Sequence, residues 1–229
     1  RFLSADVLVL NHSLFFASLG TIAENAEEEE DGIGGGFLFK NDFVIFDEAQ
    51  HLDRVASRHI GLSVSSGQIR FNLQRLWNPR TEKGILSFLR KGAVVQKVAD
   101  ALEQAEKLFD EMEFACKALH EKAPRRLREW KELRIRQADI VEDLVSLPLQ
   151  RVREALGQLI ETSEDEETSA ELIECNRRIA EIRDAVATFI GQAAEQHVYW
   201  VERSGRNRQN LSLNAAPINA ADFLRRRLF

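Results

Sequence analysis

The chain has 229 residues, 44% of them hydrophobic, and a formal net charge of −6. This length can bury one large core or two small ones. The acidic balance excludes a uniformly basic nucleic-acid-binding protein, so any contact with DNA or RNA must come from local patches. No apolar run approaches the roughly 20 residues of a membrane-spanning helix. The two cysteines, Cys116 and Cys175, lack metal-ligand spacing and fit a reducing cytoplasm.

Strands and helices are predicted to alternate in the first zone, residues 1–66. The stretches 6–11 and 43–48 each contain a continuous apolar run, which is typical of a strand buried on both faces of a sheet. Each run leads into a short amphipathic stretch, and the second of these, 49–58, predicts a helix. This alternation favours a parallel α/β sheet. The chain begins with Arg1 and not with Met, so we expect a piece of a longer protein.

The second zone, residues 67–196, is predicted to be nearly all helical. Apolar residues recur every three or four positions over 94–119 and again over 172–189, which gives one apolar stripe on each of two long helices. Ser163 and Glu166 predict a capping box at the start of the second helix. The zone is therefore expected to be a helical bundle of about 130 residues.

The third zone, residues 197–229, returns to strands. Residues 197–203 alternate between apolar and polar types, 211–219 form a second extended stretch, and 220–229 predict a closing amphipathic helix. We expect this zone to rejoin the sheet of the first zone. The predicted fold class is thus an α/β domain that is interrupted by a large all-α insertion.

Two adjacent carboxylates, Asp47 and Glu48, follow the second apolar run directly. The plain interpretation is a strand end or a helix N-cap, where acidic residues are common. The functional interpretation is a nucleotide site, because ligands of parallel sheets bind outside the carboxyl ends of the strands. Asp47 would then hold the Mg²⁺ of the nucleotide, and Glu48 would orient and deprotonate the attacking water.

Several short motifs in chain order resemble the DinG/XPD-like branch of superfamily 2 DNA helicases. In that family an Asn-His pair ends one strand, an Asp-Glu-Ala-His box ends the next, and a helix with Leu and Ala four apart follows. A helical arch domain comes after it, and then a Tyr-Trp pair and an Ala-Pro segment. The matching residues here are Asn11-His12, Asp47-Glu48-Ala49-Gln50, Leu52 with Ala56, Tyr199-Trp200 and Ala216-Pro217-Ile218.

The resemblance implies part of an ATP-dependent helicase that is monomeric and moves on single-stranded or forked DNA. It implies an incomplete RecA-like P-loop NTPase domain (1–66 and 197–229) that carries the arch (67–196) and binds ATP with Mg²⁺ through Asp47 and Glu48. The family box ends in His where this chain has Gln50. Because Gln still donates and accepts hydrogen bonds, activity is expected to survive, with an altered link between the nucleotide site and the DNA.

The phosphate-binding loop GxxxxGK[ST] is absent from the sequence, so by the resemblance it lies upstream of Arg1. The family's iron–sulphur [4Fe-4S] insertion also belongs upstream, and neither Cys116 nor Cys175 is one of its ligands by position. The second motor domain is absent too. We therefore expect this chain alone neither to hydrolyse ATP nor to unwind DNA.

Local positive charge marks the candidate DNA contacts. Residues 70–91 hold six Lys or Arg against one Glu, and residues 121–136 hold seven against three Glu. Such stretches either contact phosphates or form solvated helix faces. Tryptophans at positions 77, 130 and 200 either stack on bases or pack in the core. The candidate DNA contacts are Asn11, His12, Arg70, Arg75, Arg125, Arg126 and Arg128, with an N-cap by Asn11 or Ser13 as the alternative for the Asn-His pair.

Three other functions fit parts of this pattern. One is a different P-loop ATPase with a helical insertion. Another is a catalytically dead helicase-like adaptor, in which the helical bundle docks a partner protein. The third is a metal hydrolase that uses Asp47, Glu48, His51 and His59, although this histidine spacing matches no familiar zinc pattern.

Overall fold

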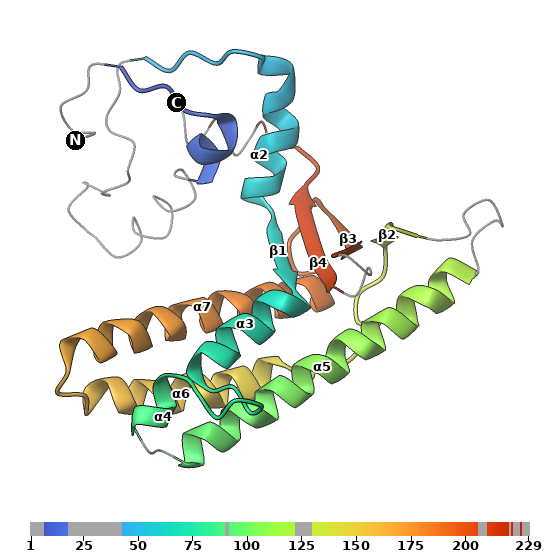
Figure 1. Cartoon of the computed structure of the whole chain (residues 1–229). Helices are drawn as coiled ribbons and strands as arrows, with labels where there is room; N and C mark the ends of the chain where they lie inside the picture. Colours follow the sequence, from blue (N-terminus) through green and yellow to red (C-terminus); the bar gives the residue numbers. More distant parts are fainter. Residues whose placement is uncertain are drawn as a thin grey trace. The chain divides into compact units, whose positions relative to one another are not determined.

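The structure is a computed structural model that describes residues 7–17, 43–89, 92–121, 130–205, 210–219, 221 and 225 (Figure 1). The chain divides into two compact units. Unit 1 comprises Arg1–Leu62 and Ala216–Phe229, and unit 2 comprises Ser63–Ala215. Each unit is described by itself below.

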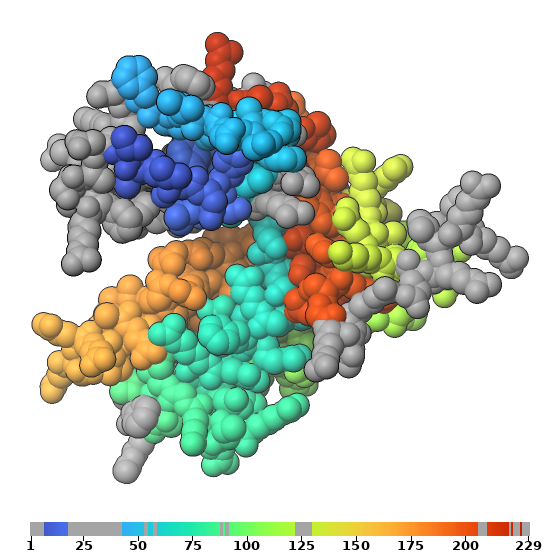
Figure 2. Space-filling view, turned by 45° about the horizontal axis from the view of Figure 1, so that its top comes forward, coloured from blue at the N-terminus to red at the C-terminus, as the bar shows by residue number. Residues whose placement is uncertain are grey.

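Unit 2 is built on a bundle of helices, as the sequence predicts. Helix α3 packs against α5 and α7, α5 packs against α6, and α6 packs against α7, so the four close into a ring. Figure 2 shows the orange atoms of α7 directly beside the turquoise atoms of α3. The helices span Ser66–Leu76 (α3), Ile85–Leu89 (α4), Gly92–Glu121 (α5), Ser146–Glu161 (α6) and Glu166–Gly191 (α7).

The predicted apolar stripes form the core of this bundle. On α7 every residue of the stripe is buried, from Leu172 to Phe189. On α5 the stripe is buried from Val94 to Met112, whereas Leu119 near the end of the helix is 38% exposed. The periodicity therefore predicted which face of each helix packs inward, except in the last two turns of α5.

The predicted capping box of Ser163 and Glu166 at the start of α7 is wrong. Asp165 is the N-cap, and its Oδ2 accepts a hydrogen bond from the backbone N–H of Thr168 at 2.9 Å. Ser163 lies two residues before the N-cap and donates its hydroxyl to the carbonyl oxygen of Asp165 at 3.2 Å. The pKa of Asp165 is lowered, mainly because Thr168 donates to the ionised carboxylate from both its hydroxyl and its backbone.

A second carboxylate on α7 predicts acid sensitivity. Hydrogen bonds from Arg177 and Arg178 lower the pKa of Glu174 from 4.5 to about 2. Because the folded-state pKa lies below the ordinary value, this group stabilises the fold above pH 4.5, and the contribution is lost as the pH falls towards 2. We expect Glu174→Gln to reduce the acid-induced loss of stability in this window, as measured by urea unfolding at several pH values. Glu164→Gln, an exposed residue between α6 and α7, is the control, and an equal effect of both changes would contradict the prediction.

The sheet of unit 2 has four strands in the order β1–β4–β3–β2. The strands are Leu62–Ser65 (β1), Glu132–Ile135 (β2), His197–Ser204 (β3) and Asn210–Pro217 (β4). β3 and β4 confirm the extended stretches predicted at 197–203 and 211–219, whereas β2 was not predicted. β2 runs antiparallel to β3, with Leu133 opposite Val201. β3 and most of β4 lie in the same compact unit as the helices. The domain boundary at 196/197 stays a prediction.

Tyr199 joins the sheet to the helices of unit 2. Its ring meets that of Phe189 edge-on, with centroids 5.8 Å apart. Its hydroxyl accepts a hydrogen bond from the backbone N–H of Ala194 at 3.0 Å and donates one to the carbonyl oxygen of the same residue at 3.1 Å. The backbone N–H and carbonyl of Ala194, in the turn between α7 and β3, are thus both satisfied by one buried side chain.

The chain enters unit 2 on β1 and leaves it on β4, and these strands are neighbours in the sheet. The Ser63 hydroxyl on β1 donates to Asn214 Oδ1 on β4 at 2.8 Å. Asn210 Oδ1 accepts from the Ser66 hydroxyl at 3.0 Å and from the Gly67 backbone N–H at 2.9 Å, at the start of α3. Side-chain hydrogen bonds therefore tie the two connecting strands together.

In unit 1 the two predicted strands do not form, and that prediction is wrong for the described residues. Residues 7–11 and 43–46 have no regular secondary structure and belong to no sheet. Val9 and Ile45 are each 93% exposed, although their runs were predicted to be buried on both faces. The physical reason is that a strand needs a partner for its backbone hydrogen bonds, and no described part of unit 1 provides one. The RecA-like fold therefore stays a prediction.

The predicted helix at 49–58 is confirmed, with a shift. A 3₁₀ turn, η2 (Ala49–His51), leads into α2 (Leu52–Ile60). The predicted C-terminal helix at 220–229 falls almost entirely outside the described residues. Among the helices that the structure describes, none combines the length and the apolar character that crossing a membrane requires.

Candidate functional site

The Asp-Glu pair lies in a tight turn between residues 43–46, which have no regular secondary structure, and η2. Glu48 adopts a left-handed backbone conformation, with φ 53° and ψ 44°, which is uncommon for a residue other than glycine. Asp47 Oδ1 accepts a hydrogen bond from the Glu48 backbone N–H at 2.9 Å, and the Glu48 carbonyl accepts one from His51 N–H at 2.9 Å. The turn is thus held by local hydrogen bonds, and both carboxylates are exposed at its surface.

Gln50 contacts one of these carboxylates directly. Its side-chain amide donates a hydrogen bond from Nε2 to Glu48 Oε2. A hydrogen bond from a neutral amide orients a carboxylate without neutralising its charge. The structure therefore links Gln50 to Glu48, the predicted catalytic base.

The structure also brings the Asn-His pair close to this turn. The His12 ring meets the edge of the Phe46 ring, with centroids 6.3 Å apart, and Phe46 immediately precedes Asp47. Asn11 Oδ1 accepts a hydrogen bond from the Leu14 backbone N–H at 2.7 Å, which confirms that Asn11 caps the helix over residues 12–17. The contact of His12 with Phe46 thus brings together two motifs that lie far apart in the sequence.

A small aromatic cluster packs against Phe46, the residue that precedes the turn. Phe46 packs against Phe15, with ring centroids 5.2 Å apart, and stacks on Phe16. From α2, Ala56 is fully buried in this cluster and Leu52 packs against it. Leu52 and Ala56 lie four residues apart, so they face the same side of α2 and together fix its start beside the Asp-Glu pair.

The described residues contain no group of three or more His, Cys, Asp or Glu that could hold a metal ion. The metal-hydrolase alternative with His51 and His59 therefore gains no support. A magnesium ion at Asp47 would need oxygen ligands from a nucleotide and from water as well, which is how Mg²⁺ is commonly bound beside phosphates. The exposed Asp47 carboxylate fits such a role, because only its Oδ1 is engaged by the turn.

The predicted DNA contacts of unit 2 fall into two groups. Arg125, Arg126 and Arg128 lie outside the described residues. Arg70 pairs with Glu106 of α5 at 3.5 Å, and Arg75 pairs with Glu171 of α7 at 2.8 Å. The hydrogen bond to Glu171 raises the pKa of Arg75 above its ordinary value. Acids from neighbouring helices thus offset part of the positive charge of 70–91, and the DNA contacts stay predictions.

Trp130 is a packing residue and not a free stacking surface. Its side chain is 4% exposed, and the Arg203 guanidinium lies over its ring at 4.0 Å from the centroid. Arg203 also pairs with Glu113 of α5 at 2.9 Å. Sequence reasoning missed Arg203 because its partners come from distant parts of the chain. Burial of Cys116 in the same region raises the pKa of its thiol to about 12, so this cysteine is inert.

Comparison with known proteins gives one partial match. A stretch of 68 residues is 40% identical to the "ATP-dependent DNA helicase YoaA" of Haemophilus influenzae. The stretch covers 29% of this chain and 9% of the helicase, so the match spans less than a tenth of that protein. No model of a protein family matches the chain. The similarity supports a relationship to DNA helicases over part of the chain.

Proposed function

We propose that the chain is part of an ATP-dependent DNA helicase that moves on single-stranded DNA. Residues of unit 1 would belong to its first, RecA-like motor domain, and the helical bundle of unit 2 would be its arch. The partial similarity to a DNA helicase supports this proposal. The observation that carries it is the convergence of Asp47, Glu48 and Gln50 at one turn, with His12 packed against the residue that precedes them.

The geometry of the turn favours a division of labour between the two carboxylates. Bound Mg-ATP would supply the metal ion and the phosphoanhydride bond that is cleaved. Asp47 would bind the ion, in part through water, and Glu48 would orient the attacking water and accept its proton. Gln50 would act as a positioning residue, because its hydrogen bond holds the Glu48 carboxylate on the exposed side of the turn. The phosphate-binding loop and the second motor domain would come from the rest of the longer protein.

The first test is ATP hydrolysis by the full-length protein, with and without single-stranded DNA, beside this chain alone. We expect strong stimulation by DNA in the full-length protein and no hydrolysis by this chain. A full-length protein that is inactive under both conditions would overturn the proposal in favour of a catalytically dead adaptor.

Charge reversal at Arg125, Arg126 and Arg128 tests the DNA contact. We expect the triple change to glutamate to weaken binding of single-stranded DNA and to reduce the slope of log affinity against log salt by about 0.7 for each phosphate that the protein no longer neutralises. Binding would be measured by anisotropy across a salt series. The matched control reverses three basic residues along α5 and α6, namely Lys97, Lys107 and Arg151. An unchanged salt slope in the first variant would assign the stretch to a solvated face.

A further inference from the structure

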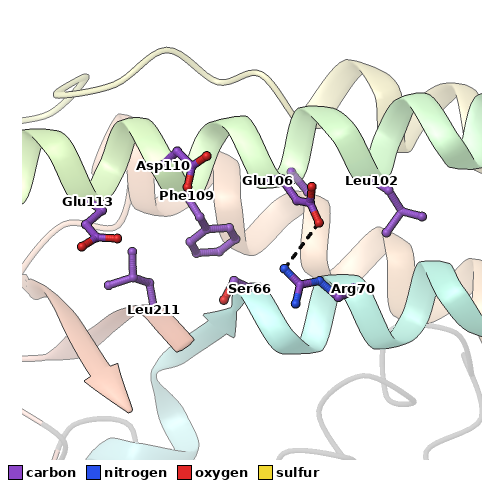
Figure 3. A pocket seen from close by; sticks show the side chains of 9 residues that line it. Ser66, Arg70, Leu102, Glu106, Phe109, Asp110, Glu113 and Leu211 are labelled. Carbon is purple, nitrogen blue, oxygen red and sulfur yellow. Dashed lines mark ion pairs between the residues drawn. The ribbon is translucent and has the colours of Figure 1, made fainter. Parts of the chain in front are cut away.

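A groove of about 310 Å³ runs between α3 and α5 in unit 2, and nothing described so far accounts for it (Figure 3). The buried side chains of Leu102, Phe109 and Leu211 contribute apolar surface to it. In Figure 3 the ring of Phe109 points from α5 into the space above α3. The groove therefore offers an apolar floor to a ligand side chain.

One wall of the groove is acidic and already binds guanidinium groups of the chain itself. Glu106, Asp110 and Glu113 line it from α5, and their spacing of four and three residues places them on one helix face. Glu106 pairs with Arg70 at 3.5 Å, and Glu113 pairs with Arg203 at 2.9 Å. Asp110, between them, is exposed and has no ion-pair partner among the described residues. Asp110 is thus the carboxylate of this wall that a guanidinium of a ligand could pair with directly.

The ion pair between Arg70 and Glu106 can open at little cost. Its side chains are 53% and 62% exposed, and exposed pairs of this kind contribute about 0–1 kcal/mol. Both residues also line a second hollow of about 480 Å³, which continues towards Asn78 and Arg80. The pair therefore lies where two hollows meet, and displacing Arg70 would free the Glu106 carboxylate for a ligand.

We propose that this groove binds a basic segment of a partner protein, in which an arginine is flanked by apolar side chains. The arginine would pair with Asp110 and, once Arg70 is displaced, with Glu106, while an apolar neighbour would pack on Phe109 and Leu211. The charge of the lining decides the class of partner, because its three carboxylates outnumber the single guanidinium of Arg70 and so favour a further guanidinium over a phosphate group. This surface is separate from the turn proposed for ATP hydrolysis and from Arg125, Arg126 and Arg128, and it shares only Arg70 with the candidate DNA contacts.

Fluorescence anisotropy with the whole chain tests the proposal. The probe is a labelled eight-residue peptide in which arginine alternates with leucine, and the same peptide with glutamate in place of arginine is the negative control. We expect Asp110→Asn to weaken binding about fivefold, the equivalent of one exposed ion pair. Arg70→Gln should strengthen binding several-fold, because it removes the internal competitor for Glu106. Glu164→Gln makes the same change of charge outside the groove and should have little effect.

Three results would overturn the proposal. Equal weakening by Asp110→Asn and Glu164→Gln would show general attraction to an acidic protein. Weaker binding after Arg70→Gln would show that the peptide does not compete for Glu106. A single-stranded oligonucleotide that displaces the peptide, and binds more tightly after Asp110→Asn, would assign the groove to nucleic acid. Because Asp110 is exposed, its substitution should leave the helical circular-dichroism spectrum unchanged, which checks that each variant is folded.

Discussion

Replacing Glu48 by glutamine should lower DNA-stimulated ATP hydrolysis by the full-length protein by about 100-fold or more, because the variant lacks the base that accepts the proton of water. The change is nearly isosteric, and the new amide oxygen can still accept the hydrogen bond from Gln50. ATP binding should therefore be retained. Hydrolysis would be measured as phosphate release at saturating ATP and DNA, and binding with a fluorescent ATP analogue.

The matched control for this prediction is Glu164→Gln, which removes one exposed carboxylate between α6 and α7. The control variant should hydrolyse ATP normally. Gln50→Ala should give an intermediate loss, since the Glu48 carboxylate would remain but lose its orienting hydrogen bond. Near-normal turnover by Glu48→Gln would remove Glu48 from the proposed mechanism. Loss of ATP binding in the same variant would instead indicate damage to the turn.

Truncating Phe189 to alanine should destabilise unit 2 by about 3–5 kcal/mol, the usual cost of removing a buried phenyl ring from a core. Phe189 is 2% exposed at the end of α7, and its ring meets that of Tyr199, which fastens the following turn. The change therefore leaves a cavity and loosens the joint between the helices and the sheet. Urea unfolding followed by circular dichroism would measure the change.

Phe114→Ala provides the matched control, because the same side chain is removed from a site on α5 that is 75% exposed. It should change the free energy of unfolding by less than about 0.5 kcal/mol, as is usual for surface substitutions. A similar effect of both substitutions would mean that the packing of Phe189 is not the source of the stability of this region.

The helices of unit 2 could be predicted because their signal is local and repeated. Each apolar stripe on α5 and α7 places many residues on the same helix face, so a single exposed residue such as Leu119 does not change which face is predicted to pack inward. Caps are harder, because Ser163 and Asp165 are both good capping residues and only the backbone geometry selects between them. The face of α7 that packs inward was therefore predicted more accurately than its cap.

Features that depend on distant partners could not be predicted. The cation–π contact of Arg203 with Trp130 and the short strand β2 both require segments that lie far apart in the sequence. The apolar runs of unit 1 show the opposite error. Their composition favours a buried strand, yet composition cannot supply the neighbouring strand on which burial depends. In the candidate site the sequence indicated Asp47 and Glu48, but not the hydrogen bond by which Gln50 orients the second of them.

The chain enters unit 2 on β1 and leaves it on β4, and these strands are neighbours, so the unit is attached to the rest of the chain like a cassette. Its size can change without altering the distance that separates the two points where unit 1 is interrupted. The bonds of Ser63 to Asn214 and of Ser66 to Asn210 close the base of the cassette with side chains that unit 2 itself provides. Such an attachment permits helices to be lengthened, exchanged or deleted in evolution, or in the laboratory, while the turn that carries Asp47 and Glu48 keeps its own local support.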